Sequence, residues 1–334
     1  MSAASQVQTF HAQIAANRRR SLLLVVVVIG LLAVFGFVVG YAMSGVPEGG
    51  YVATAIAVVI ALFMTSVSYF AGDSVVLAAS QAKPLRPEDA PQLANIVREL
   101  TIAANIPPPK VYLIDDTAPN AFATGRSPKH ASIAVTTGLL QKLDREELQG
   151  VIAHELAHVR NLDIRFALLV GVLVGSIVLL ADFFLRWTWW GGGMRGGSRS
   201  SGRGKDGGGA LIIILFIIAL VLAILAPIVA RMVQMAVSRQ REYLADASSV
   251  DLTRNPYGLE RALAKIGTDK EVLEVANRAT QHLYFVNPIK KFEARASNLM
   301  STHPPIVERV NRLRALTGNA PVDTGALTAL AGLD

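Results

Sequence analysis

The stretch GVIAHELAHVRNLDIRFALLVGVL, residues 150–173, joins a polar helix with two histidines to a long apolar run. His154 and His158 are four residues apart, and Glu155 follows the first histidine. Positions i and i+4 share one face of a helix, so both imidazoles can reach one metal ion, with Glu155 free to act as a general base on a water molecule. The alternative is a helix whose histidines only pack; the spacing and the glutamate together favour the metal site.

A catalytic metal site of this type needs a third protein ligand. The chain has no cysteine, so thiolate ligands and disulfides are excluded, and the third ligand must be a histidine or a carboxylate. In SRQREYLADASS, residues 238–249, Glu242 and Asp246 are four apart on a predicted helix, so Glu242 could bind the metal and Asp246 could hydrogen-bond a ligand imidazole. Because Arg239 and Arg241 are adjacent, the same pattern fits an exposed, charged helix face equally well.

The apolar runs favour the metal-ligand interpretation of Glu242. Four runs meet or approach the length of about 20 residues that a spanning helix needs, and they predict two transmembrane hairpins. The predicted spans are residues 21–43, 51–72, 166–185 and 210–230. The second hairpin brings its two ends together, and with them His158 and Glu242. Asp182 and the basic, Gly-rich loop at residues 188–209 leave a second possibility, in which this hairpin folds back without crossing the membrane. Either form of the hairpin brings His158 close to Glu242.

Composition and charge point to a membrane protein. The chain is 52% hydrophobic and only 17% charged, against about 25% charged residues in soluble domains. Arg18–Arg20 precede the first run and the linker at residues 44–50 has no Lys or Arg, which predicts a cytoplasmic N-terminus. The net charge of +7 is attributed to topology and to contact with the lipid bilayer, and since no nucleic-acid-binding motif is present, we expect no nucleic-acid partner.

The segments between the apolar runs are predicted to be soluble. A helix is expected at residues 87–104, strands at 110–114 and 132–137, and a helix that starts at Asp144 with a capping box to Glu147. The predicted organisation is residues 1–78 with the first hairpin, 79–164 as a cytoplasmic catalytic part, 165–235 with the second hairpin, 236–317 as a second catalytic part and 318–334 as a flexible tail.

Three motifs in this order carry a family resemblance. They are AHELAHVRNLD at residues 153–163, REYLADASS at 241–249, and STHPP followed by ERV within 301–310. From about residue 20 to residue 316 the chain resembles HtpX-type membrane-bound zinc metallopeptidases, relatives of the CAAX prenyl endopeptidases. The resemblance implies a mainly α membrane protein with a small β element, in which four transmembrane helices accompany a gluzincin-like zinc protease domain.

The same resemblance implies roles for individual residues. One zinc ion per chain is held by His154, His158 and Glu242, and Glu155 serves as base and acid. PNAFATG, residues 119–125, looks like an edge strand that holds the substrate. The remaining implied roles are support of the ligand residues by Asp246 and Asn161, substrate binding by Asn120, and stabilisation of the tetrahedral intermediate by His303 and Arg309.

The expected function is that of a zinc-dependent endopeptidase at the cytoplasmic face of a prokaryotic inner membrane. Its substrates would be membrane or misfolded proteins, cleaved in protein quality control under stress. One rival is an intramembrane protease, which the polar segments QKLDREELQG (residues 141–150) and RNLDIR (160–165) disfavour. The other rival is a membrane-embedded zinc-binding scaffold or transporter without protease activity, which would not need Glu155.

Overall fold

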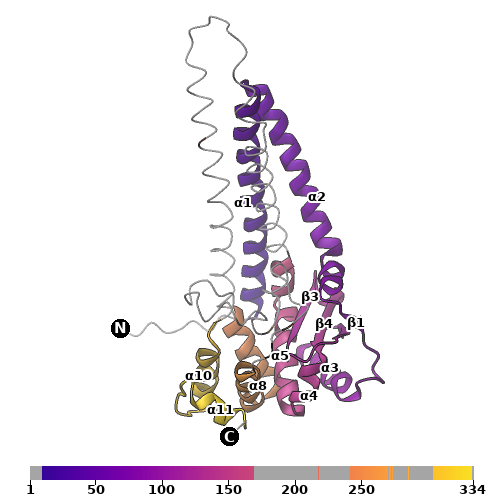
Figure 1. Ribbon diagram of the computed structural model, residues 1–334, viewed down its shortest axis with the longest axis vertical. Helices are drawn as coiled ribbons and strands as arrows, with labels where there is room; N and C mark the ends of the chain where they lie inside the picture. The colour runs from indigo at the N-terminus through magenta and orange to yellow at the C-terminus, as the bar shows by residue number, and fades with distance from the viewer. Residues whose placement is uncertain are drawn as a thin grey trace, which may run out of the picture. The chain divides into compact units, whose positions relative to one another are not determined.

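The computed structural model describes residues 10–168, 217, 241–269, 271, 273, 285 and 304–332. The chain divides into two compact units, Met1–Arg18 with Tyr69–Leu168 and Gln234–Asp334, and Arg19–Ser68 with Leu169–Val233. The described elements (Figure 1) are α1 (Phe10–Ser44), α2 (Pro47–Ala79), β1 (Lys83–Pro84), α3 (Pro91–Ala104), β2 (Lys110–Ile114), β3 (Ala121–Gly125), η1 (Pro128–His130), β4 (Ala131–Thr136), α4 (Thr137–Lys142), α5 (Arg145–Arg160), α8 (Pro256–Thr268), α10 (Ile306–Leu316) and α11 (Ala326–Leu330). Residues 241–253 are also helical and are called the Glu242 helix.

The small sheet has the strand order β1-β2-β4-β3. β2 and β4 are parallel, whereas β1 with β2 and β3 with β4 are antiparallel. The strands expected from the sequence coincide with β2 and, within one residue, with β4. β3 lies at the edge of the sheet, so the expectation of an edge strand within PNAFATG is confirmed.

The two faces of the sheet are covered by different elements, because alternate residues of a strand point to opposite faces. On one face, Ala123 and Ile133 belong to the main hydrophobic core with residues of α3, α5, α8 and α10. This core buries the apolar side of α3 that the helical periodicity predicts: Leu93, Ile96, Val97 and Leu100. On the other face, Phe122 and Ala134 pack with Leu77 near the end of α2.

The position of α5 follows from local sequence signals and from two glycines. The Asp144 side chain accepts from the Glu147 backbone and the Glu147 side chain accepts from the Asp144 backbone, which confirms the expected capping box. Gly150 of α5 and Gly258 of α8 let the two helices approach closely: a Cβ at Gly150 would lie 2.6 Å from the backbone nitrogen of Leu259. The close approach fixes α5 between α8 and the sheet.

α1 and α2 form an antiparallel hairpin that lies mostly in the second unit (Figure 1). Small residues allow the two backbones to come close, since a Cβ at Gly36 would lie 2.9 Å from the Cβ of Ala57. The hydroxyl of Thr54 also donates to the backbone oxygen of Ala33 at 3.2 Å. Hydrogen bonds and small-residue packing of this kind hold helices together where the hydrophobic effect does not.

Among the described residues, one helix, Pro47–Val67 within α2, is long and apolar enough to cross a membrane. It overlaps the predicted span at residues 51–72. The predicted span at residues 21–43 contains a shorter apolar helix, Val25–Tyr41. The other two predicted spans lie outside the described residues except for a few positions, so the count of four spans stays a prediction.

The expectation of a flexible tail after residue 318 differs from the structure. Leu327 of α11 and Ala331 are buried in the main core. The side chain of Asn311 also bonds the backbone of Val322 twice, at 2.9 Å and 2.7 Å. The apolar spacing of Leu327, Leu330 and Ala331 is that of one helical face, a signal that the neighbouring Gly and Pro residues obscured.

Replacing Gly150 by Ala tests the close packing of α5 on α8. The added methyl group would press on the backbone of Leu259, so we expect the free energy of unfolding to fall by about 1–3 kcal/mol. Thermal unfolding of the full chain in detergent measures the change. Gly325→Ala is the matched control, because its nearest neighbouring atom would lie 3.5 Å away; equal melting temperatures for the two variants would contradict the packing argument.

Candidate metal centre

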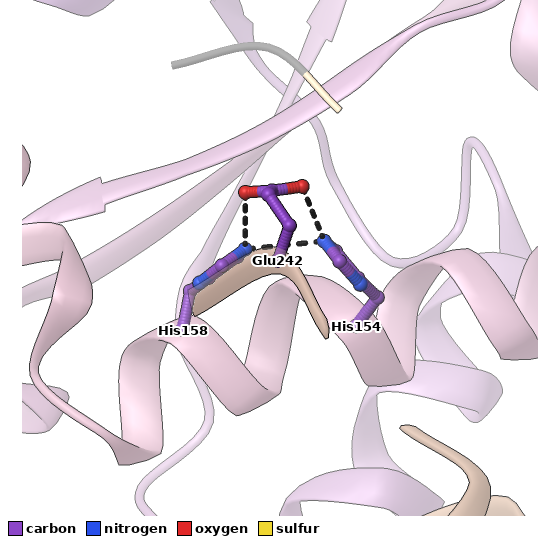
Figure 2. A group of neighbouring side chains, drawn as sticks. All are labelled: His154, His158 and Glu242. Carbon is purple, nitrogen blue, oxygen red and sulfur yellow. Dashed lines mark hydrogen bonds and ion pairs between the residues drawn. The ribbon is translucent and has the colours of Figure 1, made fainter. Parts of the chain in front are cut away.

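Two histidines on α5 face a glutamate from the Glu242 helix. His154 and Glu242 are buried and His158 is half-buried. Figure 2 shows the two imidazoles rising from one face of α5 toward the carboxylate of Glu242. The Glu242 helix is held on α5 by a buried hydrogen bond, in which the Ser249 hydroxyl donates to the backbone oxygen of Gly150 at 2.8 Å.

The three side chains converge on one point. The Nε2 atoms of His154 and His158 lie 3.1 Å apart. Glu242 Oε2 lies 3.6 Å from His154 Nε2, and Glu242 Oε1 lies 3.4 Å from His158 Nε2. One ligand atom from each residue lies within 4.8 Å of the other two, so the group can hold a metal ion. Two imidazole nitrogens and one carboxylate are also the donor set that zinc accepts in catalytic sites.

The second nitrogen of His154 is held by a carboxylate that is itself held by an arginine. His154 Nδ1 lies 2.9 Å from Asp246 Oδ1, as the four-residue spacing from Glu242 predicts. Arg309 of α10 donates to both oxygens of Asp246, at 2.9 Å and 2.7 Å. The bidentate pair fixes the carboxylate and leaves His154 Nε2 directed toward the metal site.

The second nitrogen of His158 is held in the same way by Asp163, a role that the sequence interpretation did not assign. His158 Nδ1 lies 3.1 Å from Asp163 Oδ2. On its other side, Asp163 Oδ1 lies 3.5 Å from Arg241, whose guanidinium covers the ring of Phe166. A signal was present: a ligand imidazole needs an acceptor for its second nitrogen, and Asp163 is the third residue after the end of α5.

Glu155 connects α5 with the edge strand. Its carboxylate is buried and accepts a hydrogen bond from the backbone of Ala123 in β3. Burial raises the pKa of Glu155 above its usual value, although the two neighbouring histidines oppose the shift. A carboxylate on this side of α5, beside but outside the ligand group, is placed as the motif predicts for a general base.

The charges of the other groups are also set by their neighbours. Burial alone would lower the pKa of His158, but the bonds to Asp163 and Glu242 raise it well above its usual value. Burial alone would raise the pKa of Asp246, but Arg309 and His154 hold it below its usual value. The carboxylates of Asp163 and Glu242 thus stabilise positive charge at the imidazole of His158.

The balance of buried charge fits a divalent cation. The buried ionisable side chains of the described cluster, besides the histidines, are Glu155, Asp163, Glu242, Asp246, Arg241 and Arg309. With neutral imidazoles, these four carboxylates and two guanidinium groups leave two negative charges in excess. A bound divalent cation removes that excess, and uncompensated charge in a buried site is costly.

The remaining predicted site residues are placed as follows. Asn120 lies at the start of β3, where its side-chain oxygen accepts from the Ala121 backbone at 3.0 Å. Asn161 is buried and ends α5, its backbone N–H donating to the Ala157 oxygen at 2.9 Å. Arg309 is buried with Asp246, and His303 lies outside the described residues. The roles expected for these four residues stay predictions.

Phe285 also borders the site, although no pattern in the sequence indicates this. Its backbone N–H donates to the Ala121 oxygen of β3 at 2.7 Å, and its backbone oxygen accepts from Arg309 at 3.2 Å. Its ring meets the imidazole of His154 edge to face, with the centroids 4.9 Å apart. Phe285 therefore pairs with the edge strand at Ala121, two residues before Ala123, whose backbone bonds Glu155.

The family to which the chain belongs follows from this site and from sequence comparison. The sequence pattern of Peptidase family M48 matches residues 87–317, which include all the ligand residues. The match covers more than half of the chain. The chain belongs to peptidase family M48.

Within this family, similar proteins carry the name Protease HtpX homolog. The protein of Caldanaerobacter subterraneus subsp. tengcongensis is 44% identical over 311 residues, which cover 93% of this chain and 99% of the relative. That of Streptococcus gordonii is 43% identical, with 91% and 99% covered, and that of Listeria monocytogenes serotype 4b is 45% identical, with 90% and 98% covered. The resemblance to HtpX-type peptidases is thereby confirmed.

A solved structure, that of S. mikatae Ste24p, also matches. The match covers 90% of this chain and 66% of that chain, with 21% sequence identity and a TM-score of 0.46. A likeness at this level adds nothing to what the sequence comparisons show.

Asp163→Asn tests whether the carboxylate supports His158 as a ligand. We expect the affinity for zinc to fall by about 10- to 100-fold, because the imidazole loses the charged acceptor that orients it. Competition with a chromophoric chelator measures the affinity. Asp251→Asn, at an exposed position of the Glu242 helix, should bind zinc like the unmodified chain; an equal affinity in both variants would refute the role of Asp163.

Proposed function

We propose that this chain is a zinc-dependent endopeptidase that hydrolyses peptide bonds of membrane or misfolded proteins at a membrane surface. The observation that carries the proposal is the convergence of His154, His158 and Glu242, with Glu155 buried beside them, in a member of a peptidase family. His154, His158 and Glu242 hold one zinc ion per chain.

The chemistry divides between the metal and the protein. When bound, zinc supplies a Lewis acid that polarises a carbonyl group and lowers the pKa of water to about 7. Glu155 accepts a proton from the attacking water and then delivers it to the leaving amine nitrogen. The hydrogen bond from the Ala123 backbone holds the Glu155 carboxylate in place between α5 and the edge strand.

The substrate binds in extended form along β3. Two features support this: β3 is an edge strand, and its Ala123 is bonded to Glu155, which brings any strand paired with β3 next to the general base. Asn120, which directly precedes β3, binds the substrate backbone, a role carried over from the motif alone. Phe285 occupies part of the same edge and defines one wall of the binding site.

Arg309 and His303 complete the proposed site. His303 stabilises the oxyanion of the tetrahedral intermediate, a role carried over from the motif alone. The contacts of Arg309 with Asp246 and, at 3.5 Å, with Glu242 support a role for its charge in fixing the ligands. A second proposed role of Arg309 is a direct contact with the reacting carbonyl. Asn161 is proposed to support the end of α5, the helix that carries His154 and His158.

The cellular setting is part of the proposal. The apolar helix Pro47–Val67 supports insertion in a membrane, and Arg18–Arg20 support a catalytic side that faces the cytoplasm. The names of the relatives support proteolysis. We infer a multi-pass protein of a prokaryotic inner membrane that acts in protein quality control under stress.

Glu155→Gln tests the chemistry. The amide cannot take the proton from water, so we expect hydrolysis of an unfolded casein-type substrate to fall by at least about 100-fold while zinc stays bound. The control is Glu146→Gln, at an exposed position of the same helix, which should keep full activity. Full activity of the Glu155→Gln variant would refute the role of Glu155 as general base, whereas an unmodified chain that binds zinc but hydrolyses nothing would favour the rival, a zinc-binding scaffold or transporter.

Removal of the metal tests the cofactor. Treatment with a strong chelator should abolish hydrolysis, and addition of one equivalent of zinc should restore it, since the three ligand atoms define a single site. Metal analysis should give one zinc per chain and a loss of zinc in His154→Ala. Unchanged zinc in that variant would refute the ligand assignment.

A further inference from the structure

A group of cations and aromatic rings gathers where α2 leaves its apolar span. Tyr69 and Phe70 lie in the last turn of the apolar run at residues 51–72, which ends directly before Asp73. The guanidinium of Arg126 lies 6.0 Å from the ring centroid of Tyr69 and 5.5 Å from that of Phe70. The guanidinium of Arg165 lies 5.8 Å from the ring of Tyr69. We call Tyr69, Phe70, Arg126, Lys129 and Arg165 the Arg126 surface.

These residues come from three segments of the first unit, which are tied together. Arg126 and Lys129 belong to the turn between β3 and β4, and Arg165 belongs to the helical residues 163–168 after α5. Arg165 Nε donates to the backbone oxygen of Arg126 at 2.7 Å, which joins two of the segments directly. The third segment is α2, whose Tyr69 and Phe70 rings contact the two arginines.

The depth of the surface follows from the geometry of α2. At about 1.5 Å per residue, Tyr69 and Phe70 lie about 3–5 Å before the end of the apolar run, at the boundary with the headgroup layer of about 5–7 Å on that side of the bilayer. Aromatic side chains are favoured in that layer. Leu77, further along α2, is already buried against the sheet, so α2 has left the lipid there.

The positive charges of the surface are uncompensated. Within the described residues, no ion pair joins Arg126, Lys129 or Arg165 to a carboxylate. The five residues of the Arg126 surface thus carry three positive charges and no negative charge, and Asp73 lies three residues after Phe70 in the sequence. Phe70 is exposed, and Arg126 and Arg165 are half-buried, which leaves their outer atoms accessible.

We propose that the Arg126 surface binds the phosphate groups of anionic lipids and holds the end of β3 at the bilayer. The arginines present flat guanidinium groups that suit phosphate, and the aromatic rings beneath them lie at headgroup depth. Each basic residue near an anionic leaflet is favourable. The inference rests on the proposed membrane insertion of α2. It adds the class of lipid that is bound and the residues that bind it.

Spin labels at single cysteines test the depth, since the chain has no native cysteine. A label at Ile56→Cys, exposed on the apolar span, should be accessible to oxygen and protected from an aqueous nickel reagent. A label at Ser127→Cys, in the turn after Arg126, should show intermediate access to nickel, and one at Asn319→Cys should show full access. If the label at position 127 is as accessible to nickel as the label at position 319, while the label at position 56 is protected, the proposal that the Arg126 surface contacts lipid is refuted. Full access of nickel to the label at position 56 refutes both the membrane insertion of α2 and the lipid contact. The proposed peptidase activity is tested separately by the hydrolysis assays, which do not depend on this result.

Lipid preference tests the chemistry. Native mass spectrometry of the full chain counts retained phosphatidylglycerol against phosphatidylcholine. In the double variant Arg126→Gln with Arg165→Gln, we expect the preference for the anionic lipid to fall by about fivefold for each arginine. The matched control is Arg98→Gln with Lys110→Gln, which removes the same charge from exposed positions on α3 and β2.

Further variants and a competition experiment distinguish lipid binding from a folding defect, from packing on α2 and from binding of free phosphate. Arg126→Lys with Arg165→Lys should keep most of the preference, because the charge remains; this separates lipid binding from a folding defect. An equal preference in the glutamine and control variants would mean that the arginines only pack on α2, and the proposal would fail. Displacement of the lipid by millimolar inorganic phosphate would instead indicate a site for free phosphate and would also overturn it.

Discussion

The buried ion pair between Arg309 and Asp246 is the interaction on which the site depends. It joins α10 to the Glu242 helix, and through Asp246 it reaches His154 of α5. Removing one partner of such a pair costs about 3–5 kcal/mol, because the other charge stays buried without compensation. The three elements that supply ligands and their supports are therefore held in one arrangement by a contact that tolerates little displacement.

Burying so many charges does little for stability, since desolvation offsets most of the attraction between them. Apolar side chains at the positions of Asp163, Asp246 and Arg309 would pack without that cost. The polar network is better understood as a consequence of function: each imidazole must present one nitrogen to a cation, so the other needs a carboxylate. The excess of negative charge then makes the cation part of the folded cluster.

The sequence predicted the parts of the site that depend on local spacing. The i, i+4 rule placed His154 with His158 and Glu242 with Asp246, and the capping box at Asp144 located the start of α5. The contribution of Asp163 was missed, because a residue beyond a helix end has no fixed direction. Phe285 could not be found, since its position depends on pairing with β3, which no local pattern encodes.

The edge strand links the metal site with the proposed membrane contact. Ala123 is bonded to Glu155, the proposed general base, and Arg126 lies three residues later on the same stretch of chain. At about 3.3 Å per residue, that separation is about 10 Å of extended chain. A substrate paired with β3 would therefore be cut close to the headgroups. A folded domain cannot supply an unpaired strand there, whereas a segment that has just left the bilayer unfolded can. Selection of damaged membrane proteins would then follow from where the strand is held, without any side-chain pocket specific for one sequence.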